Sequence, residues 1–130
     1  MLKLENIVAG YGHITALKDI SLEVPQGSIV SLIGANGAGK STTMKTIMGL
    51  VKPTSGKVLF EGQDITGHKT HQIVHGGISL VPEGRQILQD MSVYENLEMG
   101  AYIRNDNEIE EDIKKVFKRF PILDERSYQL

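Results

Sequence analysis

A glycine-rich run just past the first quarter of the chain constrains the fold more than any other feature. Residues 34–42 are Gly-Ala-Asn-Gly-Ala-Gly-Lys-Ser-Thr, which matches the phosphate-binding pattern G-x-x-x-x-G-K-[ST]. The mostly apolar run before it, residues 28–33, is typical of a buried strand. After it, apolar residues recur at helical spacing, at Met44, Ile47, Met48 and Val51. The sequence therefore predicts a strand, a glycine loop and a helix in succession.

This succession suits the binding of a polyphosphate. Backbone N–H groups can wrap a phosphate only where side chains are missing, so a Cβ at Gly37 or Gly39 would obstruct the approach or forbid the dihedral angles. The following helix points its positive end at the anion. We expect Lys40 to reach the β- and γ-phosphates and the Ser41 hydroxyl to bind Mg²⁺. The alternative is a glycine-rich turn that carries a lysine by chance.

The bulk composition is that of a soluble globular domain of 130 residues, with 40% hydrophobic and 23% charged residues. A formal net charge of -2 gives no electrostatic reason to expect a nucleic-acid partner. No apolar run approaches the roughly 18 residues of a membrane span, so direct membrane insertion is not expected, and the N-terminus is not a signal peptide. The absence of cysteine excludes disulfides and thiolate metal sites.

Three of the four histidines, His68, His71 and His75, cluster in a polar stretch that we interpret as solvent-exposed. The alternative is that His71 and His75 share a helix face and bind a metal, but no carboxylate or cysteine is placed to complete such a site.

Turn residues and periodicity divide the first part of the chain into short elements. Besides residues 29–33, the sequence predicts strands at residues 2–8, 20–24, 57–61 and 78–81. Residues 69–75 are expected to form a short helix that Gly76 and Gly77 end.

Beyond Pro82 the pattern becomes helical. Ser92 and Glu95 form a capping box at the start of one helix. Asp106 or Asn107 can cap a second helix, which Pro121 ends. This second helix carries one apolar stripe of Ile109, Ile113, Val116, Phe117 and Phe120, and ion pairs are expected for Glu110–Lys114 and Glu111–Lys115.

Tyr11 lies in the glycine-flanked turn of residues 9–12, upstream of the glycine loop. Its ring could stack on a purine, which would add on the order of 1 kcal/mol beyond its buried area. The alternative is a turn tyrosine that is half-buried on the sheet.

Taken in order and spacing, several motifs resemble an ATP-binding-cassette (ABC) ATPase. They are Tyr11 in its turn, residues 17–22, the loop 34–42, residues 56–58, residues 81–85 and residues 91–97. Residues 32–40, Glu83-Gly84-Arg85 and residues 120–123 further resemble the ATP-binding subunit of branched-chain amino acid importers. The resemblance extends from residue 1 to about residue 129 and implies an α/β fold, the P-loop NTPase core of a cassette with an N-terminal antiparallel β part. It places a partial nucleotide-binding core in residues 1–82, and the Q-loop-equivalent segment with the start of the helical subdomain in residues 83–130.

The resemblance also implies the ligands and the residues that contact them. The cofactors would be ATP and Mg²⁺, and the nucleotide contacts would come from Tyr11, Gly34, Asn36, Gly37, Ala38, Gly39, Lys40, Ser41 and Thr42. Most ABC ATPases carry glutamine at the position of Glu83, where the side chain reaches Mg²⁺ and the attacking water. The importer group resembles this chain in carrying glutamate, and a carboxylate can still bind a hard cation. Lys40 and Glu83 are therefore the catalytic candidates, and Ser41 and Glu83 the metal ligands. The alternative for Glu83 is a surface acid beside Arg85.

A complete cassette continues into a signature motif, a Walker B strand and a switch histidine, and none of these is recognisable after Phe120. We therefore expect a truncated chain, the N-terminal half of a cassette, with little or no ATP turnover alone and with sheet edges that promote self-association.

For the parent protein, the resemblance implies a second ATP-binding subunit and permease transmembrane subunits as partners. The location would be cytoplasmic, on the inner face of the membrane through the permease. Residues 83–101 would contact the permease, with Met91, Val93 and Tyr94 as apolar contacts unless they pack in the core. Two alternatives remain open: a binding or assembly module that does not hydrolyse nucleotide, and a soluble cassette ATPase that acts on DNA or ribosomes.

Overall fold

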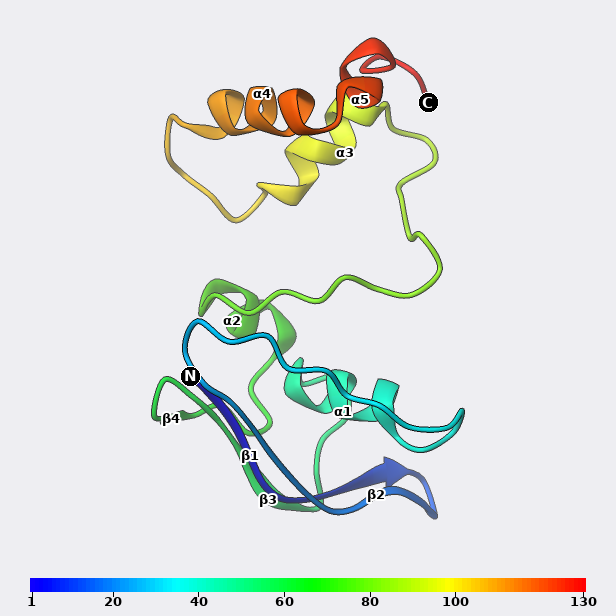
Figure 1. Ribbon diagram of the computed structural model, residues 1–130, viewed down its shortest axis with the longest axis vertical. Coiled ribbons are helices and arrows are strands. Elements are labelled where there is room, and N and C mark those ends of the chain that lie inside the picture. Colours follow the sequence, from blue (N-terminus) through cyan, green and yellow to red (C-terminus); the bar gives the residue numbers. More distant parts are fainter. The chain divides into compact units, whose positions relative to one another are not determined.

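The chain folds into two units, and the computed structural model describes all of residues 1–130. Unit 1, Met1–Val81, contains a four-stranded sheet and two helices. Unit 2, Pro82–Leu130, contains three helices (Figure 1).

The sheet of unit 1 is antiparallel throughout, with the strand order β2-β1-β3-β4. The strands are β1 (Leu2–Tyr11), β2 (Ile14–Val24), β3 (Ser55–Phe60) and β4 (Gln63–Asp64). The strands expected at residues 2–8, 20–24 and 57–61 are confirmed as parts of β1, β2 and β3, although β3 ends one residue earlier. The short strand β4 was not expected from the sequence.

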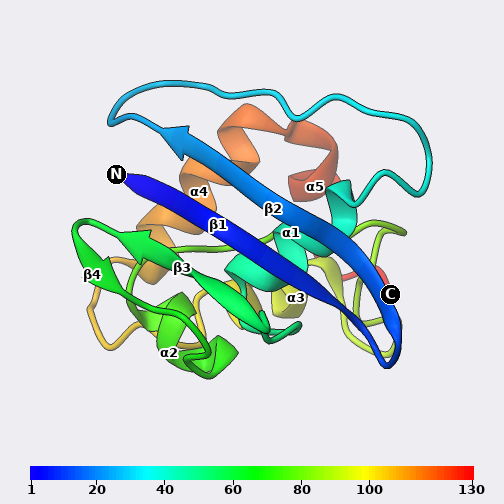
Figure 2. The ribbon, with the colours of Figure 1, turned by 90° about the horizontal axis from the view of Figure 1, so that it is seen from below.

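Two helices accompany the sheet: α1 (Lys40–Ile47), which follows the glycine loop as expected, and α2 (Thr70–His75). Figures 1 and 2 show α1 lying across one face of the sheet. The core forms between them, because alternate residues of β1 face the helix. It consists of Leu4, Ile7, Ala9, Leu17 and Val58 from the sheet and of Ile47 and Val51 from the helical side.

The two strands expected at residues 29–33 and 78–81 do not form. Both segments have irregular backbone and pair with no strand of the sheet. Their apolar side chains are largely exposed, with 98% exposure for Ile29 and 91% for Ile33 and Val81. An extended segment becomes a strand only when a neighbour accepts and donates its backbone hydrogen bonds, and unit 1 offers these segments none.

Unit 2 begins with the helix α3 (Val93–Gly100), whose capping box is confirmed. The Glu95 N–H donates to Ser92 Oγ over 3.3 Å, and the Ser92 N–H donates to Glu95 Oε2 over 2.7 Å. Two further backbone donors at this helix start are taken up by the end of the chain: Val93 N–H donates to Gln129 O and Tyr94 N–H to Ser127 O. The start of α3 is thus fixed from both sides.

The remaining helices are α4 (Ile109–Arg119) and α5 (Pro121–Glu125). Ile113 is the buried residue of α4, and the Phe117 ring lies 6.4 Å from the Tyr94 ring of α3, measured between centroids. Tyr94 therefore packs between helices α3 and α4, which is the alternative to a permease contact that the sequence left open for it. Pro121 ends α4 as expected but also starts α5, which was not expected, because proline is tolerated in the first turn of a helix.

The charged residues around α4 pair differently from the expectation. Neither Glu110–Lys114 nor Glu111–Lys115 forms an ion pair. Instead, the Asp112 carboxylate accepts from Lys115 Nζ over 2.9 Å and from Arg104 Nη1 over 2.7 Å. The forked guanidinium of Arg104 also holds both Asp106 oxygens at 2.8 Å. Asp106 in turn accepts from the Glu108 N–H, so it closes the turn before α4 although the N-cap residue is Glu108.

This pairing predicts an acid-sensitive step in the unfolding of unit 2. The hydrogen bonds from Arg104 and then from the Glu108 N–H lower the pKa of Asp106 from 3.8 to about 2. A carboxyl with a lowered pKa stabilises the folded state above its unfolded pKa, and this contribution is lost as the pH falls from about 3.8 through 2.

We therefore expect Asp106→Asn to be less stable than the wild type at pH 6, with the difference shrinking to nothing near pH 2. Urea denaturation followed by circular dichroism measures this. Asp90→Asn is the control, since Asp90 is exposed and makes no side-chain hydrogen bond; an equal, pH-dependent loss in that variant would contradict the prediction.

Candidate functional site

The glycine loop adopts backbone conformations that require glycine at two positions. Gly37 has a φ of 82° and Gly39 a φ of 97°, both in the left-handed region that L side chains rarely adopt. Between them, the Ala38 N–H donates to Ala35 O over 3.1 Å and closes a turn in which Asn36 is exposed. The expectation that dihedral angles demand glycine at Gly37 and Gly39 is confirmed.

Lys40 reaches back across this loop. Its Nζ donates to Gly34 O over 2.6 Å and to Ala35 O over 2.7 Å. The side chain is therefore held over the loop by the two carbonyls that begin it. An ammonium group has three donors, so these two bonds leave one N–H directed elsewhere.

The loop leads directly into the first turn of α1. Gly39 is the N-cap and offers no side chain to the first N–H groups of the helix, and the first turn carries no acidic residue. Thr43 stabilises this first turn, because its N–H and its hydroxyl both donate to Gly39 O, over 2.8 and 2.9 Å. Thr42 and Thr43 are buried, whereas Ser41 is exposed. This leaves an uncapped helix terminus of positive polarity with a hydroxyl beside it.

The strand β2 lies directly behind the loop. A Cβ built on Gly39 would stand 2.6 Å from Leu17 Cδ2 and 3.1 Å from Ala16 O. Leu17 is itself part of the buried core. Gly39 is thus required twice, for its backbone angle and for its close approach to β2.

Tyr11 ends β1 at the hairpin that joins β1 to β2, where it pairs with Ile14. The side chain is 47% exposed. Figures 1 and 2 both place the hairpin and the glycine loop at the same end of unit 1. The exposed part of the ring is available to a ligand at that end.

Glu83 is a residue of unit 2, and its role at the nucleotide site stays a prediction. It lies next to Pro82 at the start of unit 2 and is exposed. The turn around it contains Gly84 with a φ of 86° and Arg85 with a φ of 49°, and the Ile87 N–H donates to Arg85 O. Nowhere in residues 1–130 do three or more His, Cys, Asp or Glu side chains gather to hold a metal ion, and His68, His71 and His75 are exposed. The only one of the two expected metal ligands that unit 1 supplies is the Ser41 hydroxyl, an oxygen donor suited to a hard cation that takes its other ligands from phosphates and water.

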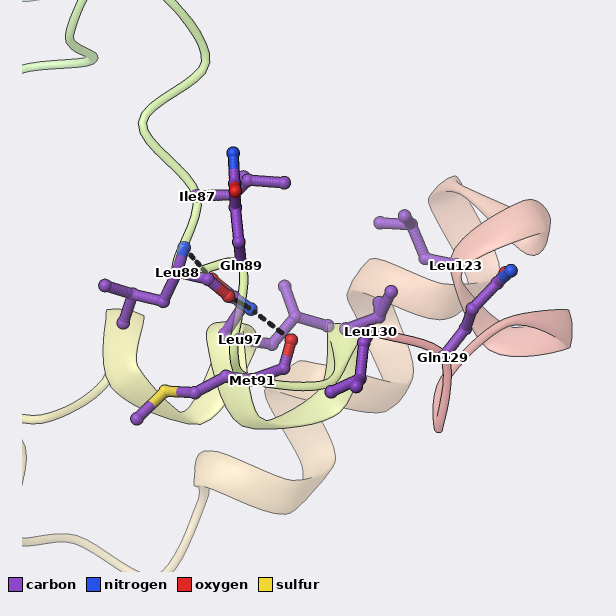
Figure 3. Close-up of a pocket in the computed structure, with 10 residues that line it drawn as sticks. Ile87, Leu88, Gln89, Met91, Leu97, Leu123, Gln129 and Leu130 are labelled. Carbon is purple, nitrogen blue, oxygen red and sulfur yellow. Dashed lines mark hydrogen bonds between the residues drawn. The ribbon is translucent and has the colours of Figure 1, made fainter.

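Unit 2 contains an apolar pocket of about 350 Å³ (Figure 3). It lies between residues 87–91, the first turns of α3 and the last residues of the chain. Its lining residues are Ile87, Leu88, Gln89, Met91, Val93, Asn96, Leu97, Leu123, Gln129 and Leu130.

Asn96 shapes this pocket, and the sequence analysis did not single it out. Its Oδ1 accepts from the Leu88 N–H over 2.9 Å, and its Nδ2 donates to Leu88 O and Met91 O over 3.0 and 3.1 Å. One side chain thus holds both ends of the Leu88–Met91 turn. An amide one residue after a capping box is the sequence feature that could have indicated this role.

Comparison with known proteins gives a consistent result. The model of the ABC transporter family matches residues 17–130. The chain is 41% identical over 129 residues to the high-affinity branched-chain amino acid transport ATP-binding protein BraG of Pseudomonas aeruginosa, covering 99% of this chain and 55% of BraG. It is 38% identical over 106 residues to the lipopolysaccharide export system ATP-binding protein LptB of Haemophilus influenzae, covering 82% of this chain and 44% of LptB.

The fold is that of solved cassettes. The structure of MJ1267, an ATP-binding cassette of an ABC transporter, matches with a TM-score of 0.83 at 33% identity and covers 98% of this chain and 56% of that one. The α/β cassette fold expected from the sequence is thereby confirmed, and the chain spans about half the length of the relatives it matches. No helix in it has the length and apolar composition that a membrane span needs.

The geometry of the loop predicts different costs for alanine at its two left-handed glycines. Both Gly37→Ala and Gly39→Ala suffer the strain of a left-handed L residue, about 1–2 kcal/mol. Only Gly39→Ala also clashes with Leu17 and Ala16, because nothing lies within 4 Å of a Cβ at Gly37. We expect Gly39→Ala to lower the free energy of unfolding of unit 1 by clearly more than Gly37→Ala does, as measured by urea denaturation. Equal losses in the two variants would mean that β2 does not support the loop.

Proposed function

This chain belongs to the ABC transporter family, and we propose that it forms the ATP-binding part of the energy-coupling subunit of a solute importer for branched-chain amino acids. The single observation that carries the proposal is the arrangement at the start of α1. A glycine loop with two left-handed glycines, a lysine bridging its first two carbonyls and an uncapped helix terminus are gathered in one place. Such a place binds a phosphate chain through backbone N–H groups and one ammonium.

In this proposal each residue of the loop has a defined task. Gly34, Asn36, Gly37 and Gly39 present backbone N–H groups to the phosphates, and Ala38 contributes the turn, because its N–H donates to Ala35 O. The N–H of Lys40 that is not bound to the loop carbonyls donates to the β- and γ-phosphates, so the ammonium is positioned before the ligand arrives. The first-turn N–H groups at Ser41 and Thr42 add the positive end of α1. Tyr11 offers its exposed ring to the purine.

Magnesium would be held by the Ser41 hydroxyl together with phosphate oxygens, and by Glu83 in the complete protein. When bound, the ion neutralises charge on the phosphates during their transfer to water. Glu83 would accept a hydrogen bond from the attacking water, which a carboxylate can do as a glutamine oxygen does. ATP hydrolysis is thus proposed for the parent protein. We expect the 130-residue chain by itself to bind nucleotide with little turnover, which also keeps the alternative of a non-hydrolysing nucleotide-binding module open.

Branched-chain amino acids are proposed as cargo because the resemblance to BraG extends over nearly the whole chain. The similarity to LptB, whose name refers to lipopolysaccharide export, covers a smaller share of the chain at lower identity. A cassette that acts on DNA is not supported, because a formal net charge of -2 gives no electrostatic reason to expect a nucleic-acid partner.

Contact with the permease is proposed for the apolar pocket of unit 2. Met91 and Val93 line it, whereas Tyr94 packs against Phe117. A pocket with mainly apolar walls suits an apolar side chain from a short helix, and its walls are fixed by the Asn96 hydrogen bonds. A second ATP-binding subunit would complete the assembly on the cytoplasmic side of the membrane.

The nucleotide site is tested by isothermal titration calorimetry with Mg·ATP. Lys40→Ala removes the ammonium and should weaken binding at least about tenfold, because a charge-assisted hydrogen bond is lost. Tyr11→Ala should weaken it less and should do so for ATP more than for a pyrimidine triphosphate. Lys45→Ala, which removes an exposed lysine from the end of the same helix, should bind like the wild type. If Lys40→Ala binds as tightly as Lys45→Ala does, the site is wrongly assigned.

The permease contact is tested by co-purification with the permease subunits of the host importer. Met91→Lys places a charge in the wall of the pocket and should reduce the co-purified permease severalfold, with Mg·ATP affinity unchanged. Met99→Lys is the matched control, because Met99 is an exposed methionine of α3 outside the pocket. Full retention of the permease by Met91→Lys would contradict the proposed contact.

A further inference from the structure

The geometry points to Asn6 and Asp19, which lie outside the glycine loop, as positioning residues for the nucleotide site. We infer that the hydrogen bond between their side chains holds a bend in the sheet, and that this bend sets the place of the Tyr11 hairpin beside the phosphate loop. The inference rests on the proposed function, since it concerns how the same site takes the purine.

The two residues face each other on neighbouring strands, and both have unusual backbone angles. Asn6 in β1 has a φ of 48° and Asp19 in β2 a φ of 58°. Among residues with a side chain, asparagine and aspartate tolerate this left-handed conformation best. Asn6 Nδ2 donates to Asp19 Oδ1 over 2.8 Å, and the Asn6 N–H donates to Ser21 Oγ over 2.9 Å. We call this set of bonds the latch.

The third strand is irregular at the same level. Gly56 in β3 has a φ of 89°, and a Cβ there would collide with the backbone oxygens of Glu5 and Asn6. The regular register of β1 with β3 is interrupted between Glu5 and Val8. That of β1 with β2 is interrupted between Leu4 and Ile7, and it shifts again between Ile7 and Ala9 and between Ala9 and Gly10. Three adjacent strands thus change direction along one line, and Figure 1 shows the resulting bend in β1 and β3.

Everything that the sheet contributes to the nucleotide site lies beyond this line. Ala9 pairs with Leu17 past the latch, and Leu17 with Ala16 stands directly behind Gly39. Tyr11 follows Ala9 by two residues, which places it about 7 Å further along the strand. The direction that the ribbon takes at the latch therefore determines where the Tyr11 ring lies relative to the loop.

Burial does not explain the choice of these residues, because Asn6 and Asp19 are both exposed. The core residues on either side, Leu4 and Ile7, are buried completely and hold the strand to α1 regardless of the latch. The Asn6–Asp19 pair therefore sets the direction of the β1–β2 hairpin and contributes little to the packing of the core.

The test compares the affinity of the 130-residue chain for Mg·ATP with that for Mg·tripolyphosphate, which has no base, by isothermal titration calorimetry. Asn6→Asp sets two carboxylates against each other and opens the latch. It should lower the ATP affinity about fivefold, the size of one aromatic stacking contact, and leave the tripolyphosphate affinity within twofold. The exchanged pair, Asn6→Asp with Asp19→Asn, restores a donor opposite an acceptor and should return both affinities to wild-type values.

Gln26→Glu is the matched control, because it adds the same charge at an exposed amide in a turn of unit 1. Asn6→Gly keeps the left-handed backbone but deletes the side chain, and should show the same selective loss if Asn6→Asp does not fold. Equal losses for both ligands, or an exchanged pair that does not regain the ATP affinity, would overturn the inference while leaving the nucleotide site in place. A wild-type chain that binds neither ligand would instead refute the proposed function.

Discussion

The structure of the site depends on the close contact between the backbone of Gly39 and the strand β2. This contact joins the glycine loop, which has no secondary structure of its own, to the buried core of the sheet at Leu17. Only a residue without a Cβ can approach so closely, and the same residue is also the N-cap of α1. The contact therefore fixes the loop and the start of the helix against β2. Positioning of this kind reduces the ordering that a ligand would otherwise have to impose.

The two units are stabilised by different means. Unit 1 relies on a continuous apolar core under a sheet in which β1 is paired on both edges. In unit 2 only Ile113 is a buried apolar residue, and polar contacts supply much of the order. The capping box, the Asn96 bonds and the Arg104 pairs each fix a loop or a helix start. Exposed polar contacts of this kind, such as the Arg104 ion pairs, are individually weak, so the stability of unit 2 depends on several of them together.

The sequence predicted the local features well and the long-range ones poorly. The glycine loop, the helix after it and the Ser92 cap all follow from short patterns whose partners are near in the chain. The strands expected at residues 29–33 and 78–81 do not form. Apolar residues favour burial, but a strand also needs a neighbouring strand to pair with, and apolar content does not supply one. The expected ion pairs of α4 do not form: Lys115 pairs with Asp112, three residues before it, in place of Glu111, and spacing alone did not reveal that Arg104, outside the helix, shares this carboxylate. Asn6 lies in no recognised motif, and the motifs that contain Asp19 and Asn96 did not indicate their roles, since these roles arise from cross-strand or turn geometry.

The exposed segment of residues 28–33 has a consequence for handling the chain. It is six residues long, rich in β-branched and aliphatic side chains, and contains neither charge nor proline. Such hexapeptides stack into cross-β fibrils when their backbone groups are free, and no charged residue interrupts this one as a gatekeeper. A concentrated preparation of the chain would then be prone to form such fibrils. A single lysine at Ser31, whose side chain makes no hydrogen bond in the fold, is the smallest change that would protect it.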